Sequence, residues 1–541
     1  MSDAPPPVLH SAFDRLVVSD RRLFGWGWAA HPTRRICAIG LRVESRGEPR
    51  RIAAGYGLSR PDVEAAHPAL PDGGASGFLV TGFLGRDGFV RLWLEIEYED
   101  GGREEFDVTE TAKPVTPQRT RRRHGWWMLQ AIWRRLKIGD VRGIMRRARA
   151  RVARVPSLGE LALVSEIAPA LRKSGTACVV FDHDMGGGAN QYRNGTIASR
   201  VASGQAVVLC TYNLPALEYR LRLLVPGEPE RTYGCASFLV LESLLAQAPV
   251  AEMFVNSPVS FDEPLVLAEW LARMRAEHPA TRLTVTMHDY FAVCPSFVLL
   301  DADGRHCGVP ALSRCDECLP RHRASFVSLT PPTQPAAWRA SWGRCLQAAD
   351  EVRCFSGASR DLTLRAYPGL DRARVTVVPH RIDFAPVRVP RLNARAPLVI
   401  GVVGEISFQK GAHVVREMLE RIERDHPDVR IVVLGTLDVA SKSPRLKVTG
   451  RYERAQLPEL VERHGINMFL FPSIWPETFS YVVAELAALE VPIVAFDLGA
   501  PAERLRRYPR ARLVTPATAE AALAAAIDFH RELAAPRATA A

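Results

Sequence analysis

The 541-residue sequence lacks any run of eighteen or more uncharged apolar residues, so we expect no membrane-spanning helix. Its first residues, MSDAPPPVLHSAFDRL, lack the positive and apolar regions of a signal peptide. These two absences predict a cytoplasmic protein. In that reducing compartment, the ten cysteines are expected to be thiols or metal ligands rather than disulfides.

Acidic residues are scarce in one segment of an otherwise balanced chain. Residues 119–154 contain thirteen Lys or Arg and one acidic residue, whereas the whole chain has a formal net charge of +11. Trp126, Leu129, Trp133 and Leu136 recur there at helical spacing, as in an interfacial helix attracted to anionic lipid. This predicts peripheral attachment to the inner face of a membrane. The alternative is a basic linker helix packed on a neighbouring domain; nucleic acid is not expected, because no recognised binding module accompanies the charge.

Length and local sequence pattern predict three domains and a linker. Roughly residues 10–112 hold short alternating runs such as FVRLWLEIEYED between turns, typical of a small antiparallel β-sandwich. From residue 176, apolar runs such as TACVVFD alternate with helical patterns, and after a break near residue 390 the pattern restarts at LVIGVVGE. Such runs predict parallel sheets covered by helices. We expect a β-sandwich at 1–112, a basic helical linker at 113–175, and α/β domains at 176–390 and 391–541.

Two successive α/β domains create a crevice between facing strand ends, where open α/β sheets bind ligands. Gly187 and Gly188 stand between a strand and a helix, where backbone N–H groups approach a phosphate or sugar. His288 follows another strand, where an imidazole donates to a sugar or phosphate oxygen. Lys410 and Gly411 open a helix, a placement suited to a diphosphate. The alternatives are loop glycines, a histidine with satisfied bonds and a surface lysine.

The stretch WPETFSYVVAEL, residues 475–486, keeps two acids in apolar surroundings. Glu477 precedes a helix that we expect to begin near Thr478. The free N–H groups at its start would face an anion, and they belong to Thr478, Phe479 and Ser480. Glu485 lies two turns further on, and a buried carboxylate there needs donors such as the two hydroxyls of a ribose. The alternative is a helix-capping Glu477 and a solvent-facing Glu485.

These motifs resemble the retaining glycosyltransferases of the two-Rossmann-domain (GT-B) type, family 4 or group 1. The resemblance spans roughly residues 176–520 and rests on five motifs: Glu477 and Glu485 as E-x7-E, Lys410–Gly411, VVPHRID at 377–383, His288–Asp289 and the glycine run. It implies transfer of a sugar, with retained configuration and no catalytic metal, from a nucleotide-diphosphate donor to a polysaccharide or lipid-linked acceptor. The pieces GWGWAAHP and RPDVEAAHP also resemble a small all-β module attached to bacterial glycosyltransferases and methyltransferases.

The resemblance implies a role for each matching residue. Glu485 would hold the ribose of the donor, while Glu477 and the amides after it would contact the transferred sugar. Lys410, followed by Gly411, would bind the diphosphate. His288 would lie beside the reacting sugar.

One residue departs from the family pattern. Family members commonly carry an Arg after the glycine of the first strand of the second domain, whereas this chain has Glu405 after Gly404. An acid there repels a diphosphate, so another cation such as Arg381 substitutes, donor affinity is low, or the enzyme is impaired. Two alternatives therefore stay open: a non-catalytic protein that binds glycan or membrane, and a nucleotide-sugar epimerase of the same architecture.

Four cysteines follow the pattern C-x12-C-x7-C-x2-C; they are Cys294, Cys307, Cys315 and Cys318. The final C-x2-C has a chelate spacing typical of structural zinc. A zinc ion would pin a loop next to His288 and take no part in the chemistry. Reduced thiols, and after them disulfides, are the alternatives.

Overall fold

The computed structural model describes most of the chain, in ranges separated by short gaps and one long gap. These ranges are 8–18, 22–45, 49–58, 60–84, 89–114, 160–213, 216–322, 334–382, 388–439, 441 and 443–535. The basic segment 119–154, for which we predicted a lipid-attracted helix, lies outside them. Within these ranges, no helix has both the length and the apolar content that crossing a membrane requires.

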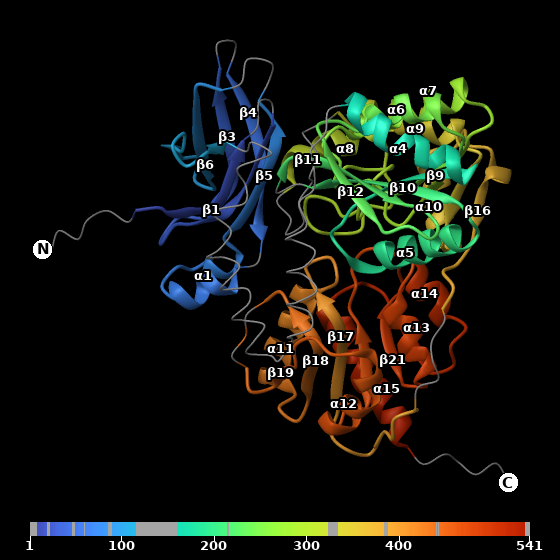
Figure 1. Cartoon of the computed structure of the whole chain (residues 1–541). Helices are drawn as coiled ribbons and strands as arrows, with labels where there is room; N and C mark the ends of the chain where they lie inside the picture. Colours follow the sequence, from blue (N-terminus) through green and yellow to red (C-terminus); the bar gives the residue numbers. More distant parts are fainter. Residues whose placement is uncertain are drawn as a thin grey trace, which may run out of the picture.

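The N-terminal part is all-β, as predicted, and we call it the β unit (Figure 1). Its eight strands form one sheet in the order β7-β6-β3-β4-β5-β2-β1-β8, antiparallel except for β1 with β8. Alternate residues of β6 are buried, as expected for a sheet with one face on a core. The strands are β1 (His10–Val18), β2 (Arg22–Ala30), β3 (Ile36–Glu44), β4 (Arg50–Leu58), β5 (Gly77–Phe83), β6 (Arg91–Tyr98), β7 (Arg103–Asp107) and β8 (Lys113–Pro114). The helices are α1 (Pro61–Ala66) and η1 (Gly73–Ala75).

The first α/β unit follows, with the sheet order β12-β11-β10-β9-β13-β14-β15-β16. In this sheet β10, β9, β13, β14, β15 and β16 run parallel to one another. Strands β11 and β12 add an antiparallel edge that the sequence pattern had not indicated. The strands are β9 (Ala177–Asp182), β10 (Ala206–Asn213), β11 (Glu218–Leu224), β12 (Arg231–Cys235), β13 (Val250–Ser257), β14 (Arg282–Thr286), β15 (Glu351–Cys354) and β16 (Val375–Val377).

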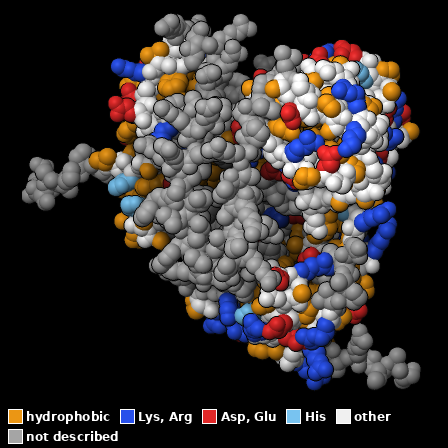
Figure 2. Space-filling model, viewed as in Figure 1, with side chains coloured by type: hydrophobic (Ala, Val, Ile, Leu, Met, Phe, Trp, Pro, Cys, Tyr) orange, Lys and Arg blue, Asp and Glu red, His pale blue; other side chains and the backbone are white. Residues whose placement is uncertain are grey.

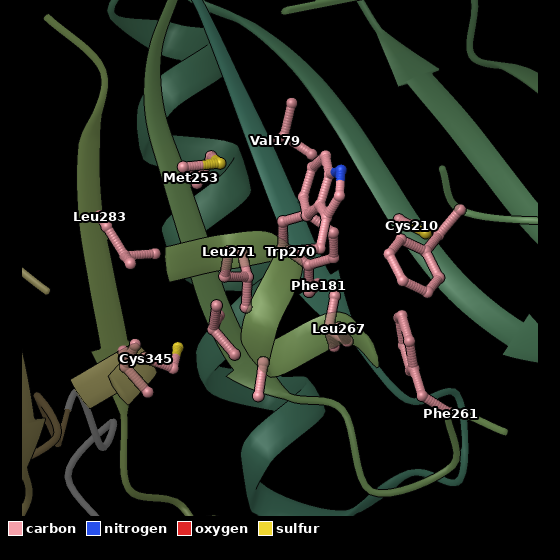
Figure 3. Packing of buried hydrophobic residues seen from close by; sticks show 14 of the residues in the cluster. Val179, Phe181, Cys210, Met253, Phe261, Leu267, Trp270, Leu271, Leu283 and Cys345 are labelled. Atoms are coloured by element: carbon pink, nitrogen blue, oxygen red, sulfur yellow. The ribbon is translucent and has the colours of Figure 1, made fainter. Parts of the chain in front are cut away.

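Helices cover the faces of this sheet. They are α4 (Glu160–Ser174), α5 (Gly187–Ala202), α6 (Val240–Gln247), α7 (Pro264–Glu277), α8 (Leu312–Cys318), η3 (Leu319–Arg321), α9 (Pro335–Ala348), α10 (Gly357–Ala366) and η4 (Arg372–Arg374). Figure 3 shows Trp270 of α7 beside Phe181 of β9, with ring centroids 5.9 Å apart. Helix α4 lies in the predicted linker range 113–175, yet Leu163, Ile167 and Leu171 pack into this core.

The second α/β unit has a fully parallel sheet in the order β19-β18-β17-β20-β21-β22. Ile400 and Val402 pack in one apolar cluster and Val399 and Val403 in another, so both faces of β17 are covered along its first five residues, which carry no charge. The strands are β17 (Val399–Ile406), β18 (Arg430–Leu437), β19 (Leu446–Val448), β20 (Met468–Phe471), β21 (Ile493–Phe496) and β22 (Ala511–Val514). The helices are α11 (Ala412–Asp425), η5 (Arg454–Gln456), α12 (Leu457–His464), α13 (Tyr481–Ala488), α14 (Gly499–Leu505) and α15 (Ala519–Ala534).

The three sheets match the predicted fold class of an all-β part followed by two α/β parts, although the domain boundaries at 112, 175 and 390 stay predictions. The β unit contacts the first α/β unit where Leu217 packs with Val17 and Phe24. Figure 2 shows acidic and basic side chains interspersed on the described surface that faces the viewer in the two α/β units. This agrees with the concentration of positive charge in residues 119–154.

Candidate active site

The predicted site residues lie at the carboxyl ends of parallel strands of both α/β units, and direct contacts join these ends. The Thr478 hydroxyl donates to the carbonyl oxygen of His288 at 2.7 Å. The Tyr290 hydroxyl donates to the carbonyl oxygen of Pro476 at 2.9 Å. A Cβ atom built on Gly188 would lie 3.2 Å from the Tyr481 ring. The glycine loop, the His288 loop and the loop before α13 therefore meet at one interface.

Glu477 is buried at this interface, with 6% of its surface exposed. The Ser473 hydroxyl donates to its Oε1 at 3.0 Å. Burial raises the pKa of Glu477, while the charge of Lys410 and the Ser473 hydrogen bond act in the opposite direction. The structure thus places the predicted sugar-contacting acid and the predicted diphosphate-binding lysine in one electrostatic environment.

A tight turn brings Lys410 beside the Glu477 loop. Gly411 has φ 85° and ψ 29°, and a Cβ atom there would lie 2.1 Å from the Pro472 carbonyl oxygen. The Ile474 amide donates to the Gln409 carbonyl at 3.1 Å. Only glycine fits such a left-handed position against a neighbouring backbone, so Gly411 allows the two loops to touch.

Helix α13 begins at Tyr481, three residues later than we predicted. Ser480 is its N-cap, and the Ser480 hydroxyl accepts a hydrogen bond from the Val483 amide at 3.3 Å. The prediction of a helix start near Thr478 was wrong, because the capping hydroxyl two residues further on sets the boundary. Thr478 and Phe479 therefore belong to the loop, and their contact with donor stays a prediction.

Glu485 lies on α13 and forms an ion pair with Arg454 at 3.4 Å. Its side chain is 17% exposed, so it does not simply face water. Burial raises the pKa of Glu485, and the Arg454 charge opposes that shift. The guanidinium of Arg454 occupies one side of the carboxylate that we predicted to hold a ribose.

His288 lies in an aromatic environment at the end of β14. Its ring stacks on Phe355 with centroids 4.2 Å apart and is 4.9 Å from the Tyr192 ring. Burial lowers the pKa of His288 well below its ordinary value, and neighbouring His380 and His183 lower it further. Its Nε2 is buried without a hydrogen-bond partner. A neutral imidazole with one unpaired nitrogen suits contact with a substrate hydroxyl.

The glycine loop is held by a buried polar network that the sequence analysis missed. The Gly186 amide donates to Asn190 Oδ1 at 2.7 Å. Arg193, 4% exposed, contacts both Asp182 and Asp184, at 3.2 and 3.0 Å. Asn190 and Arg193, one and two turns into α5, were the available signal, because buried polar side chains require partners.

The C-terminal part of the chain also matches a known family. Residues 388–534 match the family described as glycosyl transferases group 1. This region is a group 1 glycosyl transferase domain. It contains the Lys410 turn, Glu477, Glu485 and Glu405, and we call residues 388–534 the group 1 domain.

Proteins similar to parts of the chain include two mycobacterial enzymes. A glycogen synthase of Mycobacterium tuberculosis is 28% identical over 162 residues, which are 27% of this chain and 37% of the relative. An alpha-maltose-1-phosphate synthase of Mycolicibacterium smegmatis is 29% identical over 179 residues, which are 28% of this chain and 45% of the relative. The chain thus matches less than half the length of either relative.

Solved structures similar to the chain include Anabaena HepE in complex with UDP and glucose and a sucrose-phosphate synthase from Thermosynechococcus elongatus. HepE is 16% identical, with a TM-score of 0.41, over 65% of this chain and 89% of that one. The synthase is 16% identical, with a TM-score of 0.43, over 66% of this chain and 90% of that one.

Glu405 of the group 1 domain, the residue that departs from the family pattern, is paired. Arg451 Nη2 lies 2.6 Å from Glu405 Oε1, and both side chains are about two-thirds exposed, at 64% and 65%. Arg381, the cation that we considered as a substitute, is also exposed. The acid is thus accompanied by a neighbouring guanidinium, which offsets part of its repulsion toward a diphosphate.

The four cysteines of the first α/β unit do not form a metal site in this structure, so the zinc prediction is not supported. Across the described residues, no group of three or more His, Cys, Asp or Glu side chains could hold a metal ion. All four thiols are free, and Cys294 contacts the Ser296 hydroxyl at 3.3 Å. Burial raises the pKa of each, which favours the neutral thiol over the thiolate that binds zinc; the residues are Cys294, Cys307, Cys315 and Cys318.

Buried histidines at the interface make stability depend on pH. Burial lowers the pKa of His380 to about 4 from an ordinary 6.5. The unfolded chain therefore binds a proton that the folded chain excludes, and the contribution of neutral His380 to stability is lost as pH falls from 6.5 toward 4. We expect His380→Phe to lose less thermal stability than the wild type over this window, measured by melting at pH 7.5, 6 and 5. An equal fall of the melting midpoint in the two proteins between pH 7.5 and pH 5 would contradict this expectation.

Proposed function

We propose that the chain transfers a sugar from a nucleotide-diphosphate donor to a polysaccharide or lipid-linked saccharide acceptor, with retained configuration and without a catalytic metal. The observation that carries the proposal is the buried carboxylate of Glu477. The charge of Lys410 acts on it, and the next residue, Thr478, donates a hydrogen bond to the carbonyl oxygen of His288. The family match of the group 1 domain supports it, as do the names of the two mycobacterial relatives.

The chemistry follows from the positions of these groups. Lys410 at the tip of its turn would stabilise the negative charge of the leaving nucleoside diphosphate. Glu477 would contact hydroxyls of the transferred sugar, and the unpaired Nε2 of His288 would contact the same sugar from the first α/β unit. Glu485 would exchange its Arg454 partner for the ribose hydroxyls of the donor. Catalysis would come mainly from orientation of the two substrates across the interface.

The test is a transfer assay with the full chain. A panel of nucleotide sugars is first screened by thermal shift, because a ligand of the folded state raises its stability by mass action. Release of nucleoside diphosphate is then measured with and without saccharide or lipid-linked acceptors, in the presence of EDTA. We expect acceptor-dependent release that survives EDTA and a product whose new bond keeps the anomeric configuration of the donor, assigned by NMR.

Other outcomes identify the alternatives. A changed sugar without any acceptor indicates a nucleotide-sugar epimerase. Equal background turnover by wild type and Glu477→Ala indicates a protein that binds glycan or membrane without catalysis. Salt-sensitive flotation of the chain with anionic liposomes tests the peripheral membrane attachment proposed for residues 119–154.

The Glu405–Arg451 pair predicts opposite effects of two single substitutions. Arg451→Gln leaves Glu405 uncompensated and is expected to weaken binding of the nucleoside diphosphate about threefold, whereas Glu405→Gln is expected to tighten it by a similar factor. The effects are small because both side chains are exposed, and they should shrink as salt rises. Calorimetric titration measures them, and the exposed Glu459–Arg463 pair on α12 provides control substitutions. Equal weakening by both variants would contradict an electrostatic cause.

A further inference from the structure

His380 follows β16 in the connection between the two α/β units, and its ring is clamped by one aromatic residue from each. It stacks on Tyr192 of α5, with centroids 4.7 Å apart and planes 29° apart. On the other side it stacks on Phe479 of the group 1 domain, at 4.3 Å and 23°. The residue is 6% exposed. The ring therefore forms part of the packing between the units rather than of either core alone.

Polar contacts orient the same ring. His380 Nδ1 lies 2.9 Å from the Tyr481 hydroxyl, and the Tyr481 ring in turn lies against Gly188 of the glycine loop. The Tyr192 hydroxyl accepts a hydrogen bond from Arg353 Nη1 at 3.1 Å. Tyr192 and Tyr481 are thus fixed by contacts of their own, so the imidazole of His380 has little freedom to tilt.

The charge state of His380 suits this position. The titratable groups that face it are Tyr192 from α5, His288 from the end of β14, with ring centroids 5.1 Å apart, and Tyr481 from α13. No carboxylate is among the described contacts of the ring. A neutral imidazole can share one hydrogen bond with the Tyr481 hydroxyl without a buried charge.

We propose that His380 is a positioning residue for the proposed sugar transfer: it holds residues 477–481 of the group 1 domain against the glycine loop at 186–188. This inference rests on the proposed function. It does not require contact between His380 and substrate, because the ring acts through its contacts with Phe479 and Tyr481. Among the predicted donor-binding residues, Lys410 and Glu485, expected to hold the diphosphate and the ribose, lie within the group 1 domain and not among the described contacts of the His380 ring. Loss of the His380 ring should therefore disturb the alignment of the two α/β units more than it disturbs binding of the donor.

The expected consequence is a split between kcat and donor affinity. His380→Ala removes the ring from between Tyr192 and Phe479 and is expected to lower kcat about tenfold or more, since small misplacements of reacting groups are costly. Its Kd for the nucleoside diphosphate should stay within about twofold of the wild-type value, because Lys410 and Glu485, the residues predicted to hold the diphosphate and the ribose, are not among the described contacts of the His380 ring. His380→Phe restores a flat ring and should recover most of the lost kcat.

Two further measurements complete the test. Small-angle X-ray scattering of the full chain should report a larger radius of gyration for His380→Ala than for wild type, because the two units are no longer clamped. Tyr481→Phe removes only the hydroxyl at Nδ1 and should lower kcat less than His380→Ala does; it also serves if His380→Ala fails to fold.

The outcomes separate this inference from the proposed function. Unchanged kcat and unchanged scattering in His380→Ala overturn the positioning role, and so does a parallel loss of kcat and donor affinity without a scattering change. A wild-type chain that transfers no sugar to any acceptor overturns the proposed function and the catalytic part of the inference. In that case, a larger radius of gyration of His380→Ala would still support the role of the His380 ring in holding the two units together.

Discussion

Replacing Glu477 by Gln is expected to lower kcat for sugar transfer by at least about 100-fold, because it removes a preorganised charge from a buried site. The substitution keeps the shape of the side chain and an oxygen that can accept the Ser473 hydrogen bond. The fold should survive, and the thermal midpoint at pH 7 should be at least that of the wild type, because burial raises the pKa of Glu477 and so disfavours its charged form. Steady-state kinetics with donor and acceptor, together with melting curves, measure both effects.

A matched control distinguishes loss of this carboxylate from loss of any acid. Glu459→Gln removes an exposed acid on α12 that pairs with Arg463 one turn away, and such a pair contributes little. Its kcat is expected to stay within about twofold of the wild-type value. If Glu477→Gln lowers kcat less than about tenfold, the charge of Glu477 is not part of the transfer machinery.

Replacing Gly411 by Ala is expected to lower the free energy of unfolding by at least about 3 kcal/mol. The backbone there has φ 85°, and the added methyl group would lie 2.1 Å from the Pro472 carbonyl oxygen. The three nearest atoms all belong to the backbone or ring of Pro472 and include no flexible group that could move aside, so the turn that presents Lys410 must separate from the loop that leads to Glu477. Urea denaturation at neutral pH measures the change, and transfer activity should fall with it.

Gly465 provides the control for backbone strain alone. It ends α12 with φ 66°, close to the value at Gly411, but nothing lies within 4 Å of an added Cβ atom. Gly465→Ala should therefore cost only about 1 kcal/mol, the left-handed strain of an ordinary residue. Equal destabilisation by the two substitutions would mean that the close approach to Pro472 is not what requires glycine at position 411.

Local sequence pattern predicted the architecture because the information needed is itself local. The buried stretches Ala177–Phe181 of β9 and Val399–Val403 of β17 hold no charged residue, which is what strands covered on both faces require, and the short alternating runs before residue 112 indicated the all-β part. The pair Glu477 and Glu485, read with the Lys410 turn, indicated one site. That site stays a prediction, while the family match of residues 388–534 agrees with the predicted resemblance to group 1 glycosyltransferases.

Errors in the sequence interpretation arose where one side chain decides between neighbouring alternatives. The start of α13 moved from Thr478 to Tyr481 because the Ser480 hydroxyl, rather than any residue near Glu477, caps the helix. Cysteine spacing suggested a zinc site, but spacing does not fix the directions of the thiols, and the structure keeps them as free, partly buried thiols.

The sequence by itself determined the succession of an all-β part and two α/β parts and the strand ends at which Lys410, Glu477 and His288 lie, because burial and turn formation depend on residues close together in the chain. Only the tertiary structure decided which side chains meet across the interface. His380 contacts Tyr192 and Tyr481, residues more than 90 positions away on either side, and Glu405 pairs with Arg451 from the segment after β19. The His380 contacts follow from the packing of the two α/β units and the Glu405–Arg451 pair from packing within the group 1 domain, and no periodicity along a strand or helix specifies either.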